Sequence, residues 1–436
     1  MILDKKKEKK VIRIIPLSLS QFTIIYSVIA AIYGVFLSSK KLDYKKAKAS
    51  FFIFLNFTIA LLLFYFLQNH WNICHLFMCT SIGFGLANLL VLKKFQLYKP
   101  VHAILFLFWL FFILSFGYIS YTSYFTRQHD SRNFYQYENG GHFGYIGYLF
   151  QNHHLPTGNP QDYWCFFNPP LFYIISAVFL KLQDFIGLEI EAGFENLQLL
   201  SSLYTLIFIL YIYRILKKVG VQQSLSVVLS FIICSPALII MSGSLNNDIL
   251  SIMLSTMALF YAMHWYETDR LRDLIKIAFC IGFAMMAKVS AALMAIVIAV
   301  LFILRVFPNR NCWKKYLLHF GIFAIIALPI GLWFPIKNWI LYQIPPTYVQ
   351  SIDPDTPINL SSFSIAERFF TISSRETVSN VNVIMEGELR DYNLFFTTLK
   401  SFVLDEHINY SENSLLRFYL TYFILSCHHS SRFVYH

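Results

Sequence analysis

The sequence predicts an all-α membrane protein, a polytopic bundle of transmembrane helices with about 10–12 spans. Of its 436 residues, 57% are hydrophobic and 14% are charged, whereas soluble domains have roughly 45–50% and about 25%. Apolar runs of about 20 residues recur along the whole chain, which is the length that crosses a bilayer core of about 30 Å. Because these runs are continuous and do not alternate with polar residues, they favour helices over a β-barrel.

Ten runs are expected to span the membrane, and a last apolar stretch begins near Leu415. That stretch is short for a span, and the polar tail after it predicts a chain that is truncated relative to its relatives. The first run follows a Lys-rich head without a small-residue cleavage site, which favours an uncleaved anchor. The predicted spans are 18–38, 50–68, 74–92, 101–122, 197–216, 224–242, 248–265, 273–287, 289–307 and 317–340.

These runs divide the chain into four regions. Residues 1–100 are expected to form N-terminal transmembrane helices, and residues 101–345 a transmembrane core. Within the core, residues 123–196 form the first long polar segment, which is longer than ordinary connections between helices and is therefore expected to be a working loop. Residues 346–412 are expected to be a second external loop or small domain, and residues 413–436 the start of a final span.

The basic residues predict the orientation of the spans. Lys and Arg collect in the cytoplasmic loops of membrane proteins. Five basic clusters fall on one side if the segment from Pro169 to Gly187 lies in the outer interface as a helix and does not cross. The long loop then faces away from the cytoplasm. The clusters are Lys40–Lys48, Lys93–Lys99, Arg214–Lys218, Arg270–Lys276 and Arg310–Lys315.

One basic cluster does not fit this scheme. The residues from Lys5 to Arg13 would lie outside if the run from Ser18 to Ser38 crosses once, so the orientation of the first run stays open. The formal net charge of +11 does not predict a nucleic-acid partner, because the positive-inside distribution accounts for it.

Asp130 is the first candidate catalytic residue. It follows the fourth predicted span closely and is therefore expected near the outer membrane surface. A carboxylate there can act as a general base on an acceptor hydroxyl or amine, although it can also be an ordinary solvated loop acid. His129 beside it can orient Asp130, bind a metal with it, or be merely polar.

Further candidates lie at the predicted outer ends of later spans. Asn247 and Asp248 begin the run 248–265, where an Asn-Asn-Asp sequence is also typical of a turn and helix cap. Lys288 lies between two apolar runs, and Lys337 and Asn338 lie at the end of another. An ionisable group at such a position is a functional hypothesis, since its burial in lipid is costly. Both lysines could hold a phosphate, or they could be snorkelling lysines.

The long loop holds further supporting candidates, His142 and Asn168. With Glu138, His153 and His154, the residue His142 suggests a metal site, but the spacing fits no HExxH pattern. A divalent metal, with His129 or His142 as a ligand, stays open.

The order of these features resembles the GT-C glycosyltransferases. A span is followed by an acidic loop residue, then by GHFGYIGYLFQNHHLP and FFNPPLFYIISAVFLKL. This order is most similar to the protein mannosyltransferase and aminoarabinose transferase branch, which is family 39-like. The resemblance implies a catalytic membrane core over residues 101–345 and juxtamembrane helices in the first external loop, one of them opened by Pro169-Pro170.

The resemblance also implies an activity and its residues. Family members carry a catalytic Asp in the first external loop, often followed by Glu. Here Asp130 takes that position but Ser131 follows it, which leaves a metal role of that Glu in doubt. Asp248 and Lys288 match positions where relatives have Asp and Lys, and Lys337 matches one where relatives have Arg or Lys. The implied reaction moves a sugar from a polyprenyl-phosphate donor to an acceptor, with inversion.

Two alternatives to this reading are a multispan transporter or lipid flippase and an inactive homologue. A transporter should show paired halves with related breaks, and the sequence shows no internal repeat. The expected partners are the lipid-linked donor, membrane lipid and an acceptor that is a protein, glycan or lipid. The motifs favour a bacterial plasma membrane over a eukaryotic secretory membrane.

Overall fold

The computed structural model describes most residues between Tyr44 and Pro346 and short pieces beyond them. The described residues fall into two units, one within Met1–Cys234 and Met241–Pro346, the other within Ser235–Ile240 and Thr347–His436. Each unit is treated by itself. The described residues are 44–67, 72–124, 134–135, 137, 140–163, 165–221, 224–346, 348, 359–360, 362–371, 384–385, 388–389, 393–395 and 397–398.

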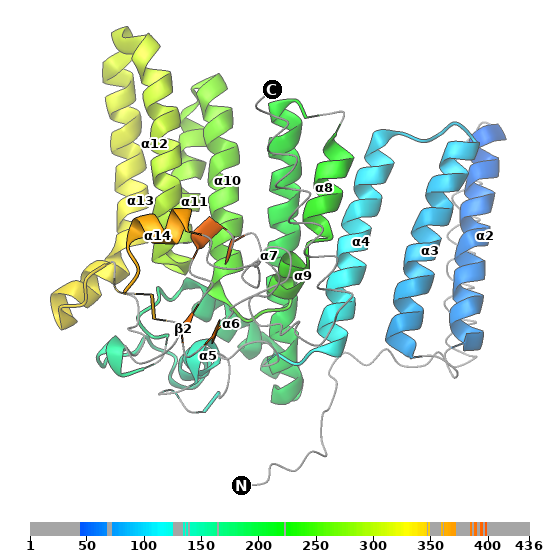
Figure 1. The fold of residues 1–436 in the computed structure, drawn as a ribbon, viewed down its shortest axis with the longest axis horizontal. Helices are drawn as coiled ribbons and strands as arrows, with labels where there is room; N and C mark the ends of the chain where they lie inside the picture. Colours follow the sequence, from blue (N-terminus) through cyan, green and yellow to red (C-terminus); the bar gives the residue numbers. More distant parts are fainter. Residues whose placement is uncertain are drawn as a thin grey trace. The chain divides into compact units, whose positions relative to one another are not determined.

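The regular secondary structure of the first unit is entirely helical in its described part (Figure 1). Within that part, six helical segments are long and apolar enough to cross a membrane, or seven if α8 and α9 form one bent span. The sixth segment, Val289–Tyr342, includes both α12 and α13. The predicted all-α membrane fold is confirmed. The helices of the described chain up to Tyr342 are α2 (Tyr44–Leu67), α3 (Ile73–Lys94), α4 (Pro100–Tyr121), α5 (Gly141–Asn152), α6 (Leu171–Phe185), α7 (Ile190–Val219), α8 (Leu225–Ile233), α9 (Pro236–Ser242), α10 (Asn247–Thr268), α11 (Leu271–Ala287), α12 (Ala292–Val306) and α13 (Trp313–Tyr342), with short 3-10 turns at Pro160–Asp162, Val289–Ala291 and Phe307–Cys312. Most of α9 belongs to the second unit.

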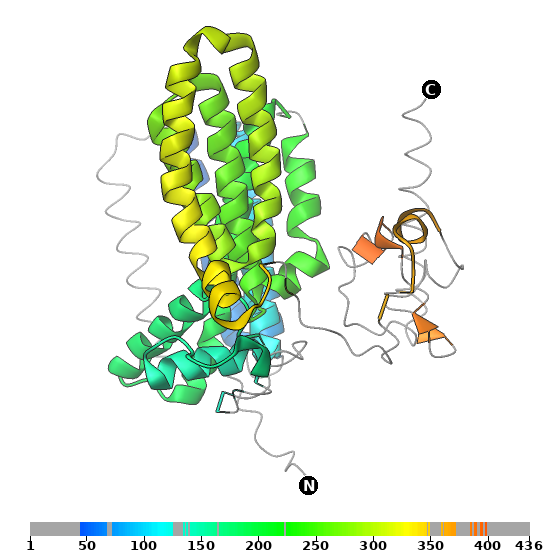
Figure 2. The ribbon, with the colours of Figure 1, turned by 90° about the vertical axis from the view of Figure 1, so that its left-hand side faces the viewer.

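The helix ends follow local sequence signals. Asn72 caps α3 by accepting from the backbone N–H of Cys74, and Pro100 opens α4, where its missing N–H has no helical partner to lose. Gly220 ends α7 in the left-handed conformation, with φ 88°, which glycine adopts without a Cβ penalty. Between α12 and α13 the chain leaves helical geometry at Asn309. The predicted spans 289–307 and 317–340 therefore correspond to α12 and α13, which form a hairpin (Figure 2).

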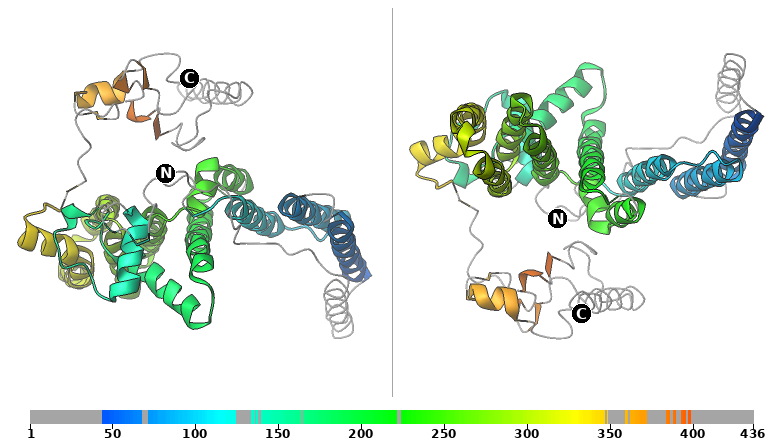
Figure 3. Two further views of the ribbon diagram at one scale, coloured as in Figure 1. Left: turned by 90° about the horizontal axis from the view of Figure 1, so that it is seen from below. Right: turned by 90° about the horizontal axis from the view of Figure 1, so that it is seen from above.

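Four helices, α10 to α13, pack around one apolar core. Trp265 of α10 is fully buried and contacts Phe302 of α12, with ring centroids 4.7 Å apart. A Cβ on Gly282 of α11 would lie only 2.9 Å from Ile330 of α13. Small residues allow such close approach between membrane helices. A row of α2, α3 and α4 continues the unit (Figures 1 and 3), with α2 and α3 largely exposed.

The helix ends separate into a basic end and a polar loop end. At the basic end, Lys218 in the last turn of α7 pairs with Glu267 of α10, and Lys315 of α13 pairs with Asp269 at 2.5 Å. At the loop end, α4 finishes, α7 and α10 begin, and α11 and α13 finish. The short helices α5 and α6 lie at this end (Figures 1 and 2). With 15 residues, α6 is about 22 Å long, too short to cross the bilayer core.

Gly147 is required by a close contact at the loop end. A Cβ at this position of α5 would clash with the backbone carbonyl oxygen of Phe134, and backbone cannot move aside as a side chain can. We expect Gly147→Ala to lower the free energy of unfolding by about 1–3 kcal/mol through overpacking, measured as a lower Tm in detergent. The matched control is Gly321→Ala in α13, where no atom lies within 4 Å of the new Cβ. An unchanged Tm for Gly147→Ala would contradict this packing.

The second unit contains little regular structure in its described part. The helix α14 (Ile365–Phe370) begins with a capping box between Ser364 and Glu367, and these hydrogen bonds lower the pKa of Glu367. The strands β1 (Ile384–Met385) and β2 (Glu388–Leu389) form an antiparallel pair. The predicted loop or small domain over residues 346–412 stays a prediction, because most of these residues lie outside the described part.

Candidate active site

An ion pair between Asp248 and Lys288 lies where α10 begins and α11 ends. The two preceding residues, Asn246 and Asn247, make different hydrogen bonds. The Asn246 side chain caps α10 by accepting from the N–H of Asp248 at 2.7 Å. The buried Asn247 Nδ2 donates to the carbonyl oxygen of Ala287 at 2.8 Å, which fixes the two helix ends together. The carboxylate of Asp248 takes part in neither of these bonds and pairs with the Lys288 ammonium.

A group of serines positions the start of α10. Ser115 of α4 lies 2.7 Å from Ser202 of α7 and 2.8 Å from Ser242, in each case between hydroxyl oxygens. Ser201 of α7 donates to the carbonyl oxygen of Ser244 at 2.5 Å. These bonds satisfy polar groups in the apolar interior, where unsatisfied ones are costly. They also hold the turn that leads into Asn246 against two transmembrane helices.

The Asp248–Lys288 pair is accessible from outside. The side chains are 30% and 37% exposed, so the pair is not sealed in the interior. Lys288 follows α11 in an extended conformation, with φ −154° and ψ 127°. A pair of this kind gains little net stability, because its attraction is weakened by solvent. Its ammonium can therefore exchange the carboxylate for a ligand phosphate.

Lys337 and Asn338 lie at the same end of the bundle on α13. Two contacts show that this helix runs parallel to α11. Gly331 approaches Met285, and further from the loop end Gly282 approaches Ile330. The Lys337 ammonium lies 5.7 Å from the ring centre of Phe334. Asn338 is 3% exposed, and its Oδ1 receives no hydrogen bond from the described residues. A buried amide oxygen of this kind is suited to accept from a ligand hydroxyl.

His142 and Asn168 have structural partners in the layer formed by α5 and α6. The buried His142 Nδ1 lies 2.7 Å from the hydroxyl of Tyr173, and the two rings stack. Asn168 Nδ2 donates to the carbonyl oxygen of Cys165 at 3.1 Å, within the turn before α6. These contacts explain both residues without a ligand, and their supporting roles stay predictions.

Two predicted site residues, His129 and Asp130, lie outside the described residues. Their distance from Asp248 and Lys288 is therefore a prediction and not an observation. In the part of the chain that the structure describes, no group of three His, Cys, Asp or Glu residues gathers in a way that could hold a metal ion. The metal role considered for His129 and His142 stays untested.

Glu195 is a polar residue at this end that the sequence reasoning did not identify. It lies in the first turns of α7 and accepts hydrogen bonds from Ser123, from the N–H of Tyr124 and from Gln198. The available signal was a pair of polar residues, Glu195 and Gln198, at the start of an apolar run. That pattern is common at membrane interfaces and does not by itself indicate a site.

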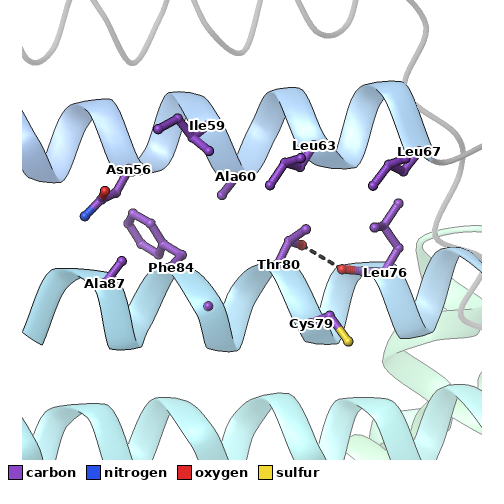
Figure 4. A pocket seen from close by; sticks show the side chains of 11 residues that line it. Asn56, Ile59, Ala60, Leu63, Leu67, Leu76, Cys79, Thr80, Phe84 and Ala87 are labelled. Carbon is purple, nitrogen blue, oxygen red and sulfur yellow. Dashed lines mark hydrogen bonds between the residues drawn. The ribbon is translucent and has the colours of Figure 1, made fainter. Parts of the chain in front are cut away.

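A separate apolar pocket of about 380 Å³ lies between α2 and α3 (Figure 4). Its lining includes Ile59, Leu63 and Phe84, with Asn56 and Thr80 as the polar members. None of the predicted site residues lines it. We therefore do not assign this pocket to the reaction.

The multispanning helical fold and the acid–lysine pair near the short helices α5 and α6 fit the resemblance to membrane glycosyltransferases of the GT-C type. The sequence model of the family described as dolichyl-phosphate-mannose-protein mannosyltransferase matches residues 168–333, somewhat over a third of the chain. The resemblance to this family is thereby confirmed over the segment that carries Asp248 and Lys288. No curated protein and no solved structure matches the chain.

Proposed function

We propose that the protein transfers a sugar from a polyprenyl-phosphate donor to an acceptor on the extracytoplasmic face of its membrane. The observation that carries this proposal is the accessible Asp248–Lys288 pair, fixed by Asn247 at the loop end of α10 and α11. The pair lies within the segment that matches the mannosyltransferase family. It offers a cation for the donor phosphate and a carboxylate beside it.

The distribution of basic residues supports the extracytoplasmic placement. The clusters that include Arg270, Arg310 and Lys315 lie at the basic end, opposite to Asp248 and Lys288. Since basic residues favour the cytoplasmic side, the loop end faces outward. A lipid-linked donor would then reach Lys288 from the outer leaflet, with its isoprenoid chain in the bilayer and its phosphate at the level of the helix ends.

The proposed chemistry divides between an acid and two lysines. Asp130 accepts the proton of the acceptor hydroxyl or amine as a general base. The acceptor atom then bonds to the anomeric carbon from the face opposite to the lipid phosphate, which inverts that centre. The bond between the anomeric carbon and the phosphate oxygen breaks, and its electron pair stays on the phosphate. Lys288 and Lys337 stabilise the charge that develops there.

The other predicted residues support these groups. Asp248 orients the Lys288 ammonium before the donor binds, and Asn247 fixes Asp248 by joining its helix to α11. The buried Oδ1 of Asn338, which accepts no hydrogen bond from the described residues, is proposed to accept from a sugar hydroxyl. His129 beside Asp130 is proposed to orient that acid. A divalent metal is not required by any step.

The experiment that tests this function compares donors. Membranes with and without the full chain are given polyprenyl-phosphate hexose labelled in the sugar, or the corresponding nucleotide sugar. We expect label to appear in an acceptor product only with the lipid donor and only when the chain is present. A transporter or flippase would move the labelled lipid between leaflets without consuming it. No transfer above control membranes would overturn the proposal.

A further inference from the structure

Glu195 joins the beginning of α7 to the segment that leaves α4. One carboxylate oxygen accepts from the Ser123 hydroxyl. The other accepts from the backbone N–H of Tyr124 at 2.9 Å and from Gln198 Nε2 at 2.8 Å. An ionised carboxylate has acceptor sites only and can take several donors at once. Ser123 and Tyr124 are thus held on α7 by hydrogen bonds to a single side chain.

Phe134, the next described residue after Tyr124, packs against the same part of α5 and α7. The Tyr124 ring lies 4.5 Å from Phe143 and 6.0 Å from Phe194 between ring centroids. The Phe134 ring lies 5.0 Å and 4.6 Å from the same two rings. Residues 124 and 134 are therefore anchored on one pair of aromatic side chains, from α5 and α7, and Glu195 directly follows Phe194.

Burial reinforces the contact with Glu195. It raises the pKa of Tyr124 to about 12, and the nearby carboxylate of Glu195 adds to this effect. The phenol, which is neutral at physiological pH even at its ordinary pKa, does not repel the carboxylate. Gln198, which is 1% exposed, also donates to the Thr122 carbonyl oxygen at 3.5 Å. Three consecutive residues after α4 are therefore hydrogen-bonded to α7: Ser123 and Tyr124 to Glu195, and Thr122 to Gln198.

We infer that Glu195 is a positioning residue, which holds Ser123 and Tyr124 on α7 and thereby fixes the point from which the chain continues to Asp130, the proposed base. This inference rests on the proposed function. It does not make Glu195 a catalytic residue, because its oxygens are occupied by Ser123, Tyr124 and Gln198. A misplacement of about 1 Å between reacting groups can lower a rate by roughly 10²-fold, so loss of one anchor should affect turnover.

Two substitutions separate positioning from catalysis by the carboxylate. In Glu195→Gln, the amide oxygen can accept from Tyr124 and Gln198, and the amide NH₂ can donate to the Ser123 hydroxyl, which also accepts. We expect its kcat within about threefold of wild type. In Glu195→Ala all three bonds are lost, and we expect kcat to fall by about 10–100-fold with the KM for the lipid donor unchanged. The matched control is Glu191→Ala, an exposed acid one turn earlier on α7.

Hydrogen exchange at the Tyr124 amide gives a readout that does not depend on activity. Exchange should be faster in Glu195→Ala and unchanged in Glu195→Gln. If both variants lose turnover equally, the charge of Glu195 is needed and the positioning role is wrong. The role is also wrong if Glu195→Ala turns over and exchanges like wild type.

Two further cases have defined outcomes. If Glu195→Ala does not fold, Ser123→Ala removes a single donor from the same anchor and should lower kcat by about 3–10-fold at constant KM. An unchanged kcat there would reject the inference. If wild type itself shows no transfer, the proposed function fails, and the anchoring of Tyr124 is then judged from amide exchange in Glu195→Ala and Glu195→Gln alone.

Discussion

Replacing Asp130 by Asn is expected to lower sugar transfer by about 10²–10⁴-fold, the range that general base catalysis contributes. The amide keeps the size and much of the hydrogen bonding of the carboxylate but cannot accept a proton. The KM for the lipid-linked donor should change little, because Lys288 and Lys337 are proposed to hold the donor phosphate. The measurement is the initial rate of label transfer in membranes with equal amounts of each variant.

The control for Asp130→Asn is Asp184→Asn in α6. Asp184 is an exposed acid at the same end of the bundle, and it takes no part in the proposed reaction. This variant should transfer at the wild-type rate. Equal transfer by Asp130→Asn and wild type would eliminate Asp130 as the general base. Asp248 would then be the next candidate for that role.

The fold was predictable because apolar length is a direct physical requirement of the bilayer. The predicted runs 101–122 and 248–265 coincide with α4 and α10 within three residues, and the run 50–68 overlaps α2, which begins six residues earlier. The number of spans was less predictable. With 17 residues, α11 is shorter than a typical span. The first predicted run, 18–38, lies outside the described residues.

The sequence singles out candidate site residues one by one but does not predict their arrangement. Asp248 and Lys288 were recognised separately, because each is an ionisable group beside an apolar run. Their pairing depends on the packing of α10 on α11 and on the bond from Asn247 to Ala287, and no local pattern encodes either. Glu195 was missed for the same reason. Its partners Ser123 and Tyr124 are far away in sequence, and only the fold brings them together.

Removing the cation of the Asp248–Lys288 pair is expected to have a second large effect on sugar transfer. Lys288→Met should lower kcat by about 10²–10³-fold, as expected when one preorganised donor to a developing charge is removed, and should raise the KM for the lipid donor. Met keeps most of the aliphatic length of lysine, so packing changes little. The Tm should change little, since a solvent-accessible ion pair contributes only about 0–1 kcal/mol to stability and these side chains are partly exposed. The loss of transfer would then not be due to unfolding.

The comparison with Asp248→Asn tests whether the two residues act together. If Asp248 acts by orienting the Lys288 ammonium, the double variant should be no slower than Lys288→Met alone, which gives a large interaction energy in the double-mutant cycle. Independent roles would give additive losses. Lys314→Met, an exposed lysine at the basic end, is the matched control and should retain wild-type transfer. If Lys288→Met also retained wild-type transfer, Lys288 would not hold the donor phosphate, and the lysine at position 337 would be the remaining candidate.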